Sequence, residues 1–512
     1  MTHPLTPPRR LAELRSAGLV PDLSGYAPLV DGQPIPDGAP VDLVYAATTE
    51  ALCSVPEADA DWVDRAVQSA RKTFDDGAWR TRSPSDRAAI LHRVADAVLA
   101  DAPVLARLHT LETGVPLAQA AGMHVPRTAE NFRFFADLLS GLAGETYTQT
   151  GRYTSLVLRE PIGVGGLIAP WNAPLVLSSM KAAACLALGN SLVIKPSEYA
   201  PLSVLHMARL MIEAGVPAGA LQVVTGTGPV TGAALAAHPG IDALGFVGGT
   251  GTGRKIMAAA AGSLKKLGLE LGGKSANLIL KDADLERAVD GALLALYAGN
   301  GEQCLAGTRL LVERPVADAF TDQFVRRSSQ LRLGDPFAAA TEIGPLAFAA
   351  HFEKVAGYAR LAEATNDARI LTGGRAAADL APGLFFEPTV VEVRDNGNRL
   401  CQEEVFGPFA TLQVVDSVDE AIAVANASDY GLVAYVWSDH LPAVMQAAHG
   451  LKAGTVWVNT PMARDLRAPF GGYKQSGIGR DGLPGSIDLF TEEKTVMLPN
   501  APLDLPRLGL GH

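Results

Sequence analysis

The stretch GVGGLIAPWNAPLVLSSMKAAACLALGNSLVIK, residues 163–195, decides the fold of this chain. It opens with a short apolar run, passes into a helical pattern at 174–188 and ends in a second apolar run at 191–194. The alternation continues to residue 272, with apolar runs at 221–224, 243–247 and 266–271 and helical patterns at 201–214, 230–237 and 251–261. Apolar strands separated by helices predict a parallel, doubly wound sheet, which binds its ligands at the carboxyl ends of its strands.

A second alternating region follows between residues 276 and 459. Its predicted helices are 285–298 and 418–427, and its predicted strands are 277–280, 309–313, 389–393, 410–415, 433–437 and 455–458. A polar, alternating segment at 146–159 predicts a hairpin that leaves the first sheet, and 491–497 predicts a similar late strand. Exposed strand edges of this kind are often covered by another subunit. The first 25 residues and the tail from Pro499 are expected to be loosely held.

Composition excludes several classes of protein. The 512 residues carry 43 basic and 54 acidic side chains, a formal charge of −11, with no basic block, which disfavours nucleic acid and anionic membranes as partners. Four scattered cysteines show neither zinc-ligand nor redox spacing, so no metal site is expected and a reduced, cytoplasmic setting is predicted. The start of the chain lacks an apolar signal core, and prolines and glycines break its most apolar window.

A thiol and a carboxylate stand out as candidates for covalent catalysis. Cys304 lies among glycines and polar residues after a helical pattern that a glycine ends, where a thiol would be presented rather than buried. A reactive cysteine needs thiolate character, which helix N-termini and nearby cations supply. Glu270 closes an apolar strand and would act as general base, unless it forms a salt bridge at the rim of the sheet. Cys185, within an alanine-rich helical run, is expected to be a buried small hydrophobe.

Other polar residues follow the predicted strands. Asn172 could offer its amide to a developing oxyanion or could cap the following helix. Lys195 and Glu198 suit hydrogen bonds to ribose hydroxyls, and the carboxylate would repel a 2′-phosphate. Glycine runs at 226–232 and 248–253 are candidate phosphate sites, the second being better because it directly precedes a helix N-terminus.

Seven motifs, in this order and spacing, resemble the aldehyde dehydrogenase superfamily over roughly residues 41–497. They are PWNAP (170–174), IKPSE (194–198), GFVGGT (245–250), LELGGK (269–274), GEQC (301–304), EEVFGP (403–408) and PFGGYKQSG (469–477). The resemblance implies an α/β fold of two doubly wound domains, Rossmann-like and catalytic, with a small β oligomerisation arm. The implied boundaries are 26–145 and 161–272 for the NAD-binding domain, 273–470 for the catalytic domain, and 146–160 and 486–500 for the arm.

The resemblance also implies a role for each motif residue. Cys304 would be the nucleophile, Asn172 would stabilise the oxyanion and Glu270 would activate the hydrolytic water. NAD, with NADP less favoured, would be held by residues from several motifs: Ile168, Trp171, Lys195, Glu198, Gly228, Gly248, Glu404 and Phe406. The product would be a carboxylic acid, formed through a thiohemiacetal and a thioester. A homodimer or homotetramer is implied.

Three residues depart from the family pattern. Val247 and Gly249 stand where Thr and Ser are common, and losing the serine hydroxyl removes a plausible phosphate contact. Asp481 stands where the family usually has a glutamate that is credited with a proton relay. Because aspartate is one methylene shorter, we expect that relay to be weakened.

The run NTPMARDLRAPF, residues 459–470, resembles the branch that oxidises hydroxymuconic semialdehydes from aromatic-ring cleavage. Arg464 is the candidate that would grip a substrate carboxylate, because a guanidinium fork suits that group, and Arg127 is a second. Alternatively, Arg464 and Arg467 pair with Asp465 or with a partner subunit. The helical run at 132–135, FRFF, is expected either to line the substrate entrance or to belong to the core.

Four other functions remain open. They are an aromatic or aliphatic aldehyde dehydrogenase of broad specificity, a CoA-acylating relative, a non-catalytic binding protein on the same scaffold, and an ordinary hydroxyacid dehydrogenase. Glu270 argues against the CoA-acylating group, whose members generally lack it, and intact Cys304 argues against a binding protein. No early Gly-x-Gly-x-x-Gly follows the first strand, which argues against the last alternative.

Overall fold

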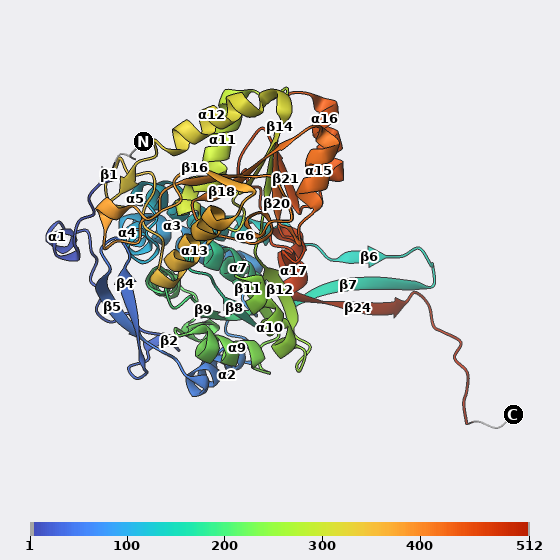
Figure 1. The fold of residues 1–512 in the computed structure, drawn as a ribbon. Coiled ribbons are helices and arrows are strands. Elements are labelled where there is room, and N and C mark those ends of the chain that lie inside the picture. The colour runs from blue at the N-terminus through green and yellow to red at the C-terminus, as the bar shows by residue number, and fades with distance from the viewer. Residues whose placement is uncertain (1–4, 510–512) are drawn as a thin grey trace.

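The computed structural model describes residues 5–509, and two mixed sheets form its framework (Figure 1). The first has the strand order β23-β12-β11-β8-β9-β10-β2-β3. Its parallel centre is β8 (Val164–Ile168), β9 (Ser191–Lys195), β10 (Leu221–Val223), β11 (Ala243–Val247) and β12 (Lys266–Glu270). Short strands run antiparallel along its edges: β2 (Leu29–Val30), β3 (Gln33–Pro34) and β23 (Gly477–Ile478).

The strand order of the first sheet creates a crevice. The chain starts in the middle with β8, moves outward through β9 and β10, and then returns to place β11 and β12 on the other side of β8. The connections after β8 and β11 therefore diverge, and ligands of such sheets bind at this switch point. The surrounding helices are α2 (Ala60–Asp75), α3 (Pro84–Ala100), α4 (Ala102–Thr113), α6 (Val125–Leu138), α7 (Pro174–Ala187), α8 (Leu202–Glu213), α9 (Ala233–Ala237), α10 (Thr250–Ala260) and α17 (Leu483–Phe490).

The second sheet has the order β16-β17-β18-β14-β13-β20-β21 and is parallel except at β16. Its strands are β13 (Ala276–Ile279), β14 (Arg309–Glu313), β16 (Ala368–Thr372), β17 (Thr389–Val393), β18 (Phe409–Val415), β20 (Val433–Trp437) and β21 (Thr455–Val458). The helices that accompany it are α11 (Leu285–Tyr297), α12 (Ala317–Ser328), α13 (Ala349–Ala364), α14 (Arg399–Gln402), α15 (Val418–Asn426) and α16 (Leu441–Gly450).

A three-stranded arm projects from the body (Figure 1). It consists of β6 (Glu145–Tyr147), β7 (Tyr153–Pro161) and β24 (Thr491–Pro499), and β7 pairs with β24 along nine residues. The hairpin and the late strand predicted from their alternating sequences thus lie side by side. The α/β class with two parallel-sheet regions is confirmed, whereas the domain boundaries stay a prediction.

The start of the chain is better ordered than predicted. Residues 5 and 6 form β1 (Leu5–Thr6), which pairs with β15 (Leu333–Gly334), and α1 (Leu11–Ser16) buries Leu11 and Leu14. The expectation that residues 1–25 are loosely held is therefore wrong for this part, and residues 1–4 lie outside the described chain. The tail does extend away from the body after β24 (Figure 1).

The remaining elements are short or local. They are the hairpin β4 (Pro40–Tyr45) and β5 (Glu50–Pro56), the pair β19 (Tyr430–Gly431) and β22 (Tyr473–Lys474), α5 (Leu117–Gln119), and the turns η1 (Ala120–His124), η2 (Ala218–Ala220), η3 (Gly228–Gly232), η4 (Ala298–Gly301), η5 (Arg314–Val316) and η6 (Ala378–Leu380). Phe132 and Phe135 of α6 are fully buried, so the run at 132–135 belongs to the core rather than to a substrate entrance. Within residues 5–509, no helix is long and apolar enough to cross a bilayer.

Candidate active site

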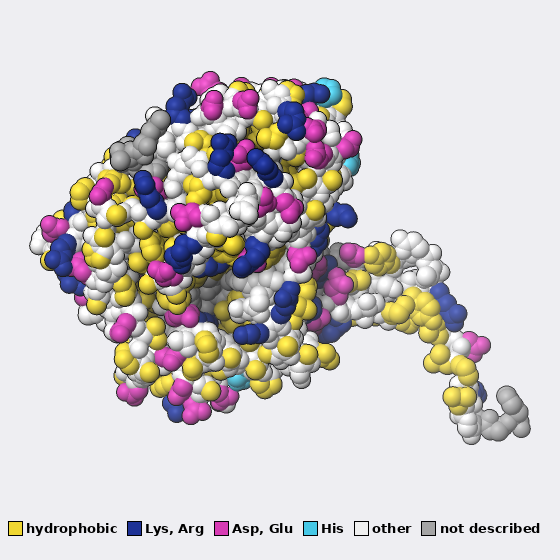
Figure 2. Space-filling model, in the orientation of Figure 1, with side chains coloured by type: hydrophobic (Ala, Val, Ile, Leu, Met, Phe, Trp, Pro, Cys, Tyr) yellow, Lys and Arg dark blue, Asp and Glu magenta, His cyan; other side chains and the backbone are white. Residues whose placement is uncertain are grey.

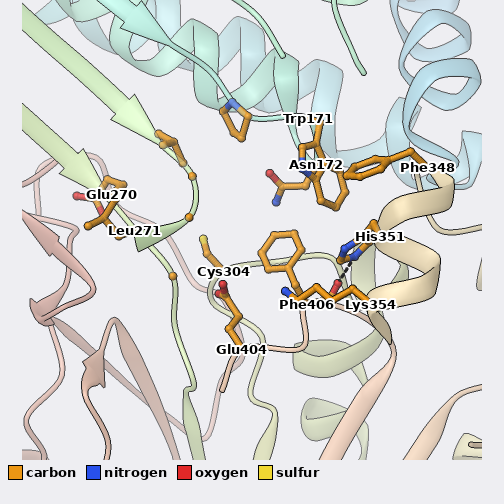
Figure 3. Close-up of a pocket in the computed structure, with 15 residues that line it drawn as sticks. Trp171, Asn172, Glu270, Leu271, Cys304, Phe348, His351, Lys354, Glu404 and Phe406 are labelled. Atoms are coloured by element: carbon orange, nitrogen blue, oxygen red, sulfur yellow. Dashed lines mark hydrogen bonds between the residues drawn. The ribbon is translucent and has the colours of Figure 1, made fainter. Parts of the chain in front are cut away.

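A cavity of about 200 Å³ lies where the loops after β8, β11 and β12 face the loop before β14 (Figure 3). Seven of the residues predicted from the motifs line it: Trp171, Asn172, Gly248, Glu270, Cys304, Glu404 and Phe406. These residues are spread over more than 230 positions of sequence, and the tertiary structure places them around one cavity. Cys304 and Asn172 both project into it from opposite sides (Figure 3).

Cys304 lies in a turn between η4 and β14, past the C-terminal end of α11, and its side chain is half-buried. Burial, followed by the carboxyl groups of Glu404 and Glu270, raises the pKa of the thiol to about 12. The sequence-based expectation that a helix N-terminus would favour the thiolate is therefore wrong for this resting state. Cys185 is fully buried, as predicted.

The side chain of Asn172 is committed to the cysteine loop. Its Nδ2 donates to the backbone carbonyl of Glu302 at 2.8 Å, two residues before the nucleophile. Ala173, not Asn172, occupies the cap position of α7, and no side chain caps that helix. The capping alternative is thus wrong, and the second N–H of the amide is available to the cavity.

Glu270 ends β12, close to the charged groups of Asp481, Lys181 and Arg480. Only 5% of the residue is exposed, and neither carboxyl oxygen has a hydrogen-bond partner in the described chain. Burial, followed by the negative charge of Asp481, raises its pKa well above the ordinary value. The carboxyl group points away from Cys304 (Figure 3), and Oε1 lies 2.7 Å from where a side chain on Gly471 would begin. The alternative prediction, in which Glu270 forms a salt bridge at the rim of the sheet, is therefore wrong.

The aspartate that departs from the family pattern still forms its ion pair. Lys181 donates from Nζ to Oδ1 of Asp481 at 2.5 Å, and both residues are almost fully buried. Oδ2 of Asp481 has no hydrogen-bond partner within residues 5–509. Asp481 thus contacts Lys181 directly, and the weakened proton relay stays a prediction.

Glycines bring the motifs together at close range. A Cβ on Gly272 would lie 2.7 Å from Oε2 of Glu404, and one on Gly273 would lie 2.5 Å from the carbonyl oxygen of Cys304. Gly301 has a φ of +76°, and its Cβ would meet the backbone of Gly407 at 2.5 Å. The glycine pair after Glu270 thus allows the cysteine loop and the Glu404 loop to approach the end of β12.

Four further predicted cofactor residues lie at the ends of β8, β9 and β10. Lys195, at the end of β9 and next to Ile168 of β8, contacts Oε2 of Glu198 at 3.1 Å. Oε1 of Glu198 lies 3.4 Å from the backbone nitrogen of Gly228, whose α-carbon faces open space. These four predicted cofactor residues lie outside the cavity around Cys304, on its β9 and β10 side.

The N-terminus of α10 can receive a diphosphate. Gly249 occupies its cap position with no side-chain cap, and nothing lies within 4 Å of where its Cβ would be. The first backbone N–H groups of a helix have no partner within the helix, so they can bind phosphate oxygens here. At Gly248 the ring of Phe246 fills the space of a Cβ, at 2.5 Å. The open helix N-terminus and the Lys195–Glu198 pair are therefore candidate sites for the diphosphate and a ribose of NAD.

The far wall of the cavity is aromatic, and sequence reasoning found only part of it. Phe406 and Trp171, both predicted cofactor residues, pack edge to face at 5.4 Å, and Glu404 accepts a hydrogen bond from Gly273 N at 2.8 Å. Three further lining residues were missed: Phe348, His351 and Lys354, at the start of α13. The three-residue spacing of His351 and Lys354 on one helix face was the available signal.

A second cavity of about 150 Å³ begins next to the nucleophile. Leu305, Met462 and Phe470 line it, and they belong to the same apolar cluster as Cys304. Both predicted substrate arginines, Arg127 and Arg464, line this cavity as well. Arg464 donates to Oδ1 of Asn131 at 3.0 Å, whereas Asp465 pairs with Arg467. No ion pair to Arg127 or Arg464 is found in the described part of the chain.

Comparison with known proteins agrees with this geometry. The model of the aldehyde dehydrogenase family matches residues 36–496. The chain is 40% identical to 5-carboxymethyl-2-hydroxymuconate semialdehyde dehydrogenase of Escherichia coli, covering 85% of this chain and 93% of the relative. It is also 40% identical to betaine aldehyde dehydrogenase of Bacillus subtilis, covering 88% and 93%.

A solved structure shows the same fold with a cofactor. The crystal structure of PnpE from Pseudomonas sp. WBC-3 has a TM-score of 0.91 and 38% identity, covering 94% of this chain and 99% of PnpE. PnpE has also been solved in complex with nicotinamide adenine dinucleotide. The chain therefore belongs to the aldehyde dehydrogenase family, as an NAD-dependent enzyme that oxidises an aldehyde.

Proposed function

We propose that this enzyme oxidises its aldehyde through a covalent intermediate on Cys304. The Cys304 thiol gives its proton to water and adds to the aldehyde carbon, and the resulting oxyanion accepts a hydrogen bond from the free N–H of Asn172. NAD, when bound, would supply the acceptor for the hydride that this carbon loses, and Cys304 would then carry the acyl group as a thioester. Water then adds to the thioester carbon, the carbon–sulfur bond breaks, and the products are a carboxylic acid and the free thiol.

Glu270 is the proposed base for the hydrolytic water. Its carboxyl group has no hydrogen-bond partner in residues 5–509, so turning it from Gly471 toward Cys304 breaks no hydrogen bond. Burial raises the pKa of this carboxyl well above its ordinary value, which makes the carboxylate a stronger base once its proton is lost. The ion pair of Lys181 and Asp481 lies beside the resting carboxyl and offers a route for its proton.

We further propose that the substrate is a semialdehyde that bears a carboxylate. The observation that carries this is the pair Arg127 and Arg464 in one otherwise largely apolar cavity, without a carboxylate partner in the described chain. Burial, then the neighbouring Arg127, lowers the pKa of Arg464 to about 10, so it remains charged at neutral pH. Within the described chain Arg464 donates to uncharged acceptors, Asn131 Oδ1 and Met180 Sδ, and a substrate carboxylate would supply a charged one.

The names of the two relatives describe substrates of opposite charge. The name of the Escherichia coli relative describes a substrate with a carboxylate, in line with a cavity that carries two arginines. The betaine aldehyde of the Bacillus subtilis relative is a cation, which two arginines would repel. A product of aromatic-ring cleavage fits the carboxylate and the apolar wall formed by Trp457, Met462 and Phe470.

Broad specificity for aromatic or aliphatic aldehydes is the second candidate. The apolar side chains of the substrate cavity would bind any hydrophobic aldehyde by burial alone. A non-catalytic binding protein is no longer an alternative, because the family assignment establishes an enzyme.

Substitution of Arg464 distinguishes the two specificities. We expect Arg464→Ala to lower kcat/KM for a carboxylate-bearing semialdehyde by about a hundredfold, because a charge-assisted, bidentate contact is lost. The value for an uncharged aldehyde of similar size should change less than about threefold. Arg467→Ala is the matched control, since Arg467 is exposed and pairs with Asp465. An equal loss for both substrates would show that Arg464 is structural, and broad specificity would then be the better proposal.

A further inference from the structure

His351 joins three parts of the site that the motifs contribute separately. It lies in the first turn of α13, and its side chain is 5% exposed. Nε2 lies 2.6 Å from the carbonyl oxygen of Phe406, the contact drawn as a dashed line in Figure 3, and 3.5 Å from Oε1 of Glu302. Its ring packs against Trp171, with centroids 5.0 Å apart, and against Phe348 and Phe406.

The partners of His351 determine which nitrogen carries its proton. A backbone carbonyl can only accept, so Nε2 must be the protonated nitrogen and must donate to Phe406. Burial, and then the charge of Lys354, lowers the pKa of His351 to about 4. Burial raises the pKa of Glu302 well above its usual value. At neutral pH the ring is therefore a neutral N–H donor rather than half of an ion pair.

Phe406 has a backbone conformation that needs such support. Its φ is +65°, in the left-handed region, which a bulky residue other than glycine rarely adopts. Strained residues of this kind persist only where their surroundings hold them. The hydrogen bond from His351 acts on the peptide unit of Phe406 itself, and the Phe406 ring forms one wall of the cavity opposite Cys304 (Figure 3).

Glu302 connects this support to the nucleophile. Its carboxyl oxygen accepts a hydrogen bond from Ala347 N at 3.0 Å, which anchors the chain just before α13, and its backbone carbonyl accepts the amide of Asn172. Cys304 follows two residues later. A displacement of His351 would therefore move Phe406 and, through Glu302, the loop that carries the Cys304 sulfur.

We propose that His351 is a positioning residue: backed by Glu302, it holds Phe406 in its left-handed conformation and so sets the aromatic wall at a defined place relative to Cys304. The proposal rests on the proposed function in one respect, namely that Phe406 contacts the nicotinamide end of NAD. It assigns to a histidine on α13 a role that none of the seven motifs contains.

The test uses two substitutions of His351 in the full-length enzyme. Leu keeps much of the packing but has no donor, whereas the amide N–H of Gln can still reach the Phe406 carbonyl. We expect His351→Leu to raise the Kd of NAD, measured by titration calorimetry, by about tenfold and to lower kcat. His351→Gln should restore the Kd to within about threefold of wild type. Equal effects of Leu and Gln would overturn the proposal.

A double-mutant cycle shows whether His351 acts through Phe406. In a Phe406→Ala background, we expect His351→Leu to change the Kd of NAD by less than about twofold. A full effect in that background would overturn the proposal. If Leu prevents folding, His351→Asn, whose shorter amide cannot reach the carbonyl, takes its place in the cycle.

A matched control separates positioning from general stability. Tyr358, also on α13, donates to Oε2 of Glu403 at 2.8 Å, outside the cavity. Tyr358→Phe removes a hydrogen bond from the same helix to the same loop, and we expect it to lower the apparent Tm while the Kd of NAD stays constant. If Tyr358→Phe and His351→Leu alter the Kd equally, His351 has only a structural role.

A crystal structure of His351→Leu distinguishes failure of this inference from failure of the proposed function. The inference requires φ of Phe406 to leave the left-handed region or to become heterogeneous. An unchanged Phe406 conformation would overturn it whatever happens to NAD binding. A displaced Phe406 with unchanged NAD affinity would instead remove Phe406 from the proposed cofactor site, and with it the functional part of the inference.

Discussion

At the scale of single residues, burying the carboxyl group of Glu270 lowers the folding stability of the protein. A carboxyl group whose pKa is raised by burial keeps its proton in the native state at a pH where the unfolded chain has lost it. The native state then binds more protons than the unfolded state, so stability falls as pH rises from the ordinary glutamate pKa toward the raised value. This cost is consistent with selection for chemistry rather than for stability.

Substitution of Glu270 by Gln should separate the two steps of the reaction. Because only the hydrolytic step uses the carboxyl group as base, we expect Glu270→Gln to retain a burst of about one NADH per site while steady turnover falls about 10²- to 10⁴-fold. The variant should also have a higher apparent Tm than wild type at pH 8, with the difference shrinking toward pH 5. Stopped-flow absorbance and differential scanning fluorimetry provide the measurements.

Glu213→Gln is the control for both readouts, because Glu213 is an exposed residue of α8. Loss of the burst in Glu270→Gln would place Glu270 in the steps before the thioester instead. An unchanged Tm at pH 8 would contradict the stability argument.

Gly249 offers a second prediction at the residue scale. Its φ is −70°, any side chain can adopt that value, and nothing lies within 4 Å of its would-be Cβ. Gly249→Ser therefore adds a hydroxyl at the open N-terminus of α10, where the backbone N–H groups would face the diphosphate of NAD. We expect the Kd of NAD to fall about three- to tenfold in calorimetric titrations.

Gly249→Ala is the matched substitution, with a side chain but no hydroxyl, and we expect it to leave the Kd near wild type. If Ser and Ala weaken binding alike, the space at Gly249 is needed by the cofactor itself. Glycine in place of the serine that is common in the family would then be an adaptation that makes room for the cofactor, rather than the loss of a phosphate contact.

At the scale of elements, the join between η1 and α6 buries two histidines without partners. His109 of α4 and His124 of η1 lie with ring centroids 4.4 Å apart, and none of their four nitrogens has a hydrogen-bond partner in the described chain. Burial, and then Arg127, lowers the pKa of His124 to about 4, and burial lowers the pKa of His109 well below its usual value. The π-turn of η1 leads directly into the helix that carries Arg127.

The lowered pKa of His124 predicts a loss of stability in acid. Below the ordinary histidine pKa of about 6.5 the unfolded chain binds protons that the native state excludes, so stability declines as pH falls from 6.5 toward 4. Leu is similar in size to His. We expect the apparent Tm of His124→Leu to fall less between pH 7 and pH 5 than the apparent Tm of wild type. His449→Leu, at an exposed position of α16, should reproduce the wild-type slope. Parallel slopes for all three proteins would refute the explanation.

At the scale of the whole molecule, the arm exposes apolar side chains that a monomer would leave in water. In the register of β7 and β24, residues Leu156, Leu158, Val496 and Leu498 share one face, because cross-strand neighbours point to the same side. Leu158 is 41% exposed and Leu498 is 48% exposed. Apolar side chains are visible along the arm in Figure 2. We propose that this face packs against a second copy of the chain.

A charge on the apolar face should therefore break the assembly. We expect Leu158→Glu combined with Val496→Glu to reduce the particle mass measured by light scattering after size exclusion, because two carboxylates would be buried at the contact. Thr495→Glu, on the opposite face of the same strand, is the control and should leave the mass unchanged. Equal loss for both variants would indicate that the arm unfolds, and no loss would place the contact elsewhere.

Sequence reasoning predicted most of the framework. The five central strands of the first sheet were located to within one or two residues, because buried parallel strands are continuous apolar runs bounded by glycine and proline. Apart from the helical run at 132–135 within α6, the helices before residue 140 were not predicted, and neither were edge strands such as β2, β3 and β23. A two-residue strand has no periodicity to detect, and its pairing is decided by the neighbouring strand. The cytoplasmic location and the domain boundaries stay predictions.

By itself, the sequence determined which residues are chemically suited to the reaction: Cys304, Glu270 and Asn172 each stand at a strand end or turn that their neighbours specify. The tertiary structure alone decided their state. A thiol surrounded by protein and carboxyl groups has a raised pKa, Glu270 rests away from Cys304, and His351 supports Phe406 from a distant helix. Burial, pKa and strain depend on what lies around a group in space, and residues far apart in the chain supply those surroundings.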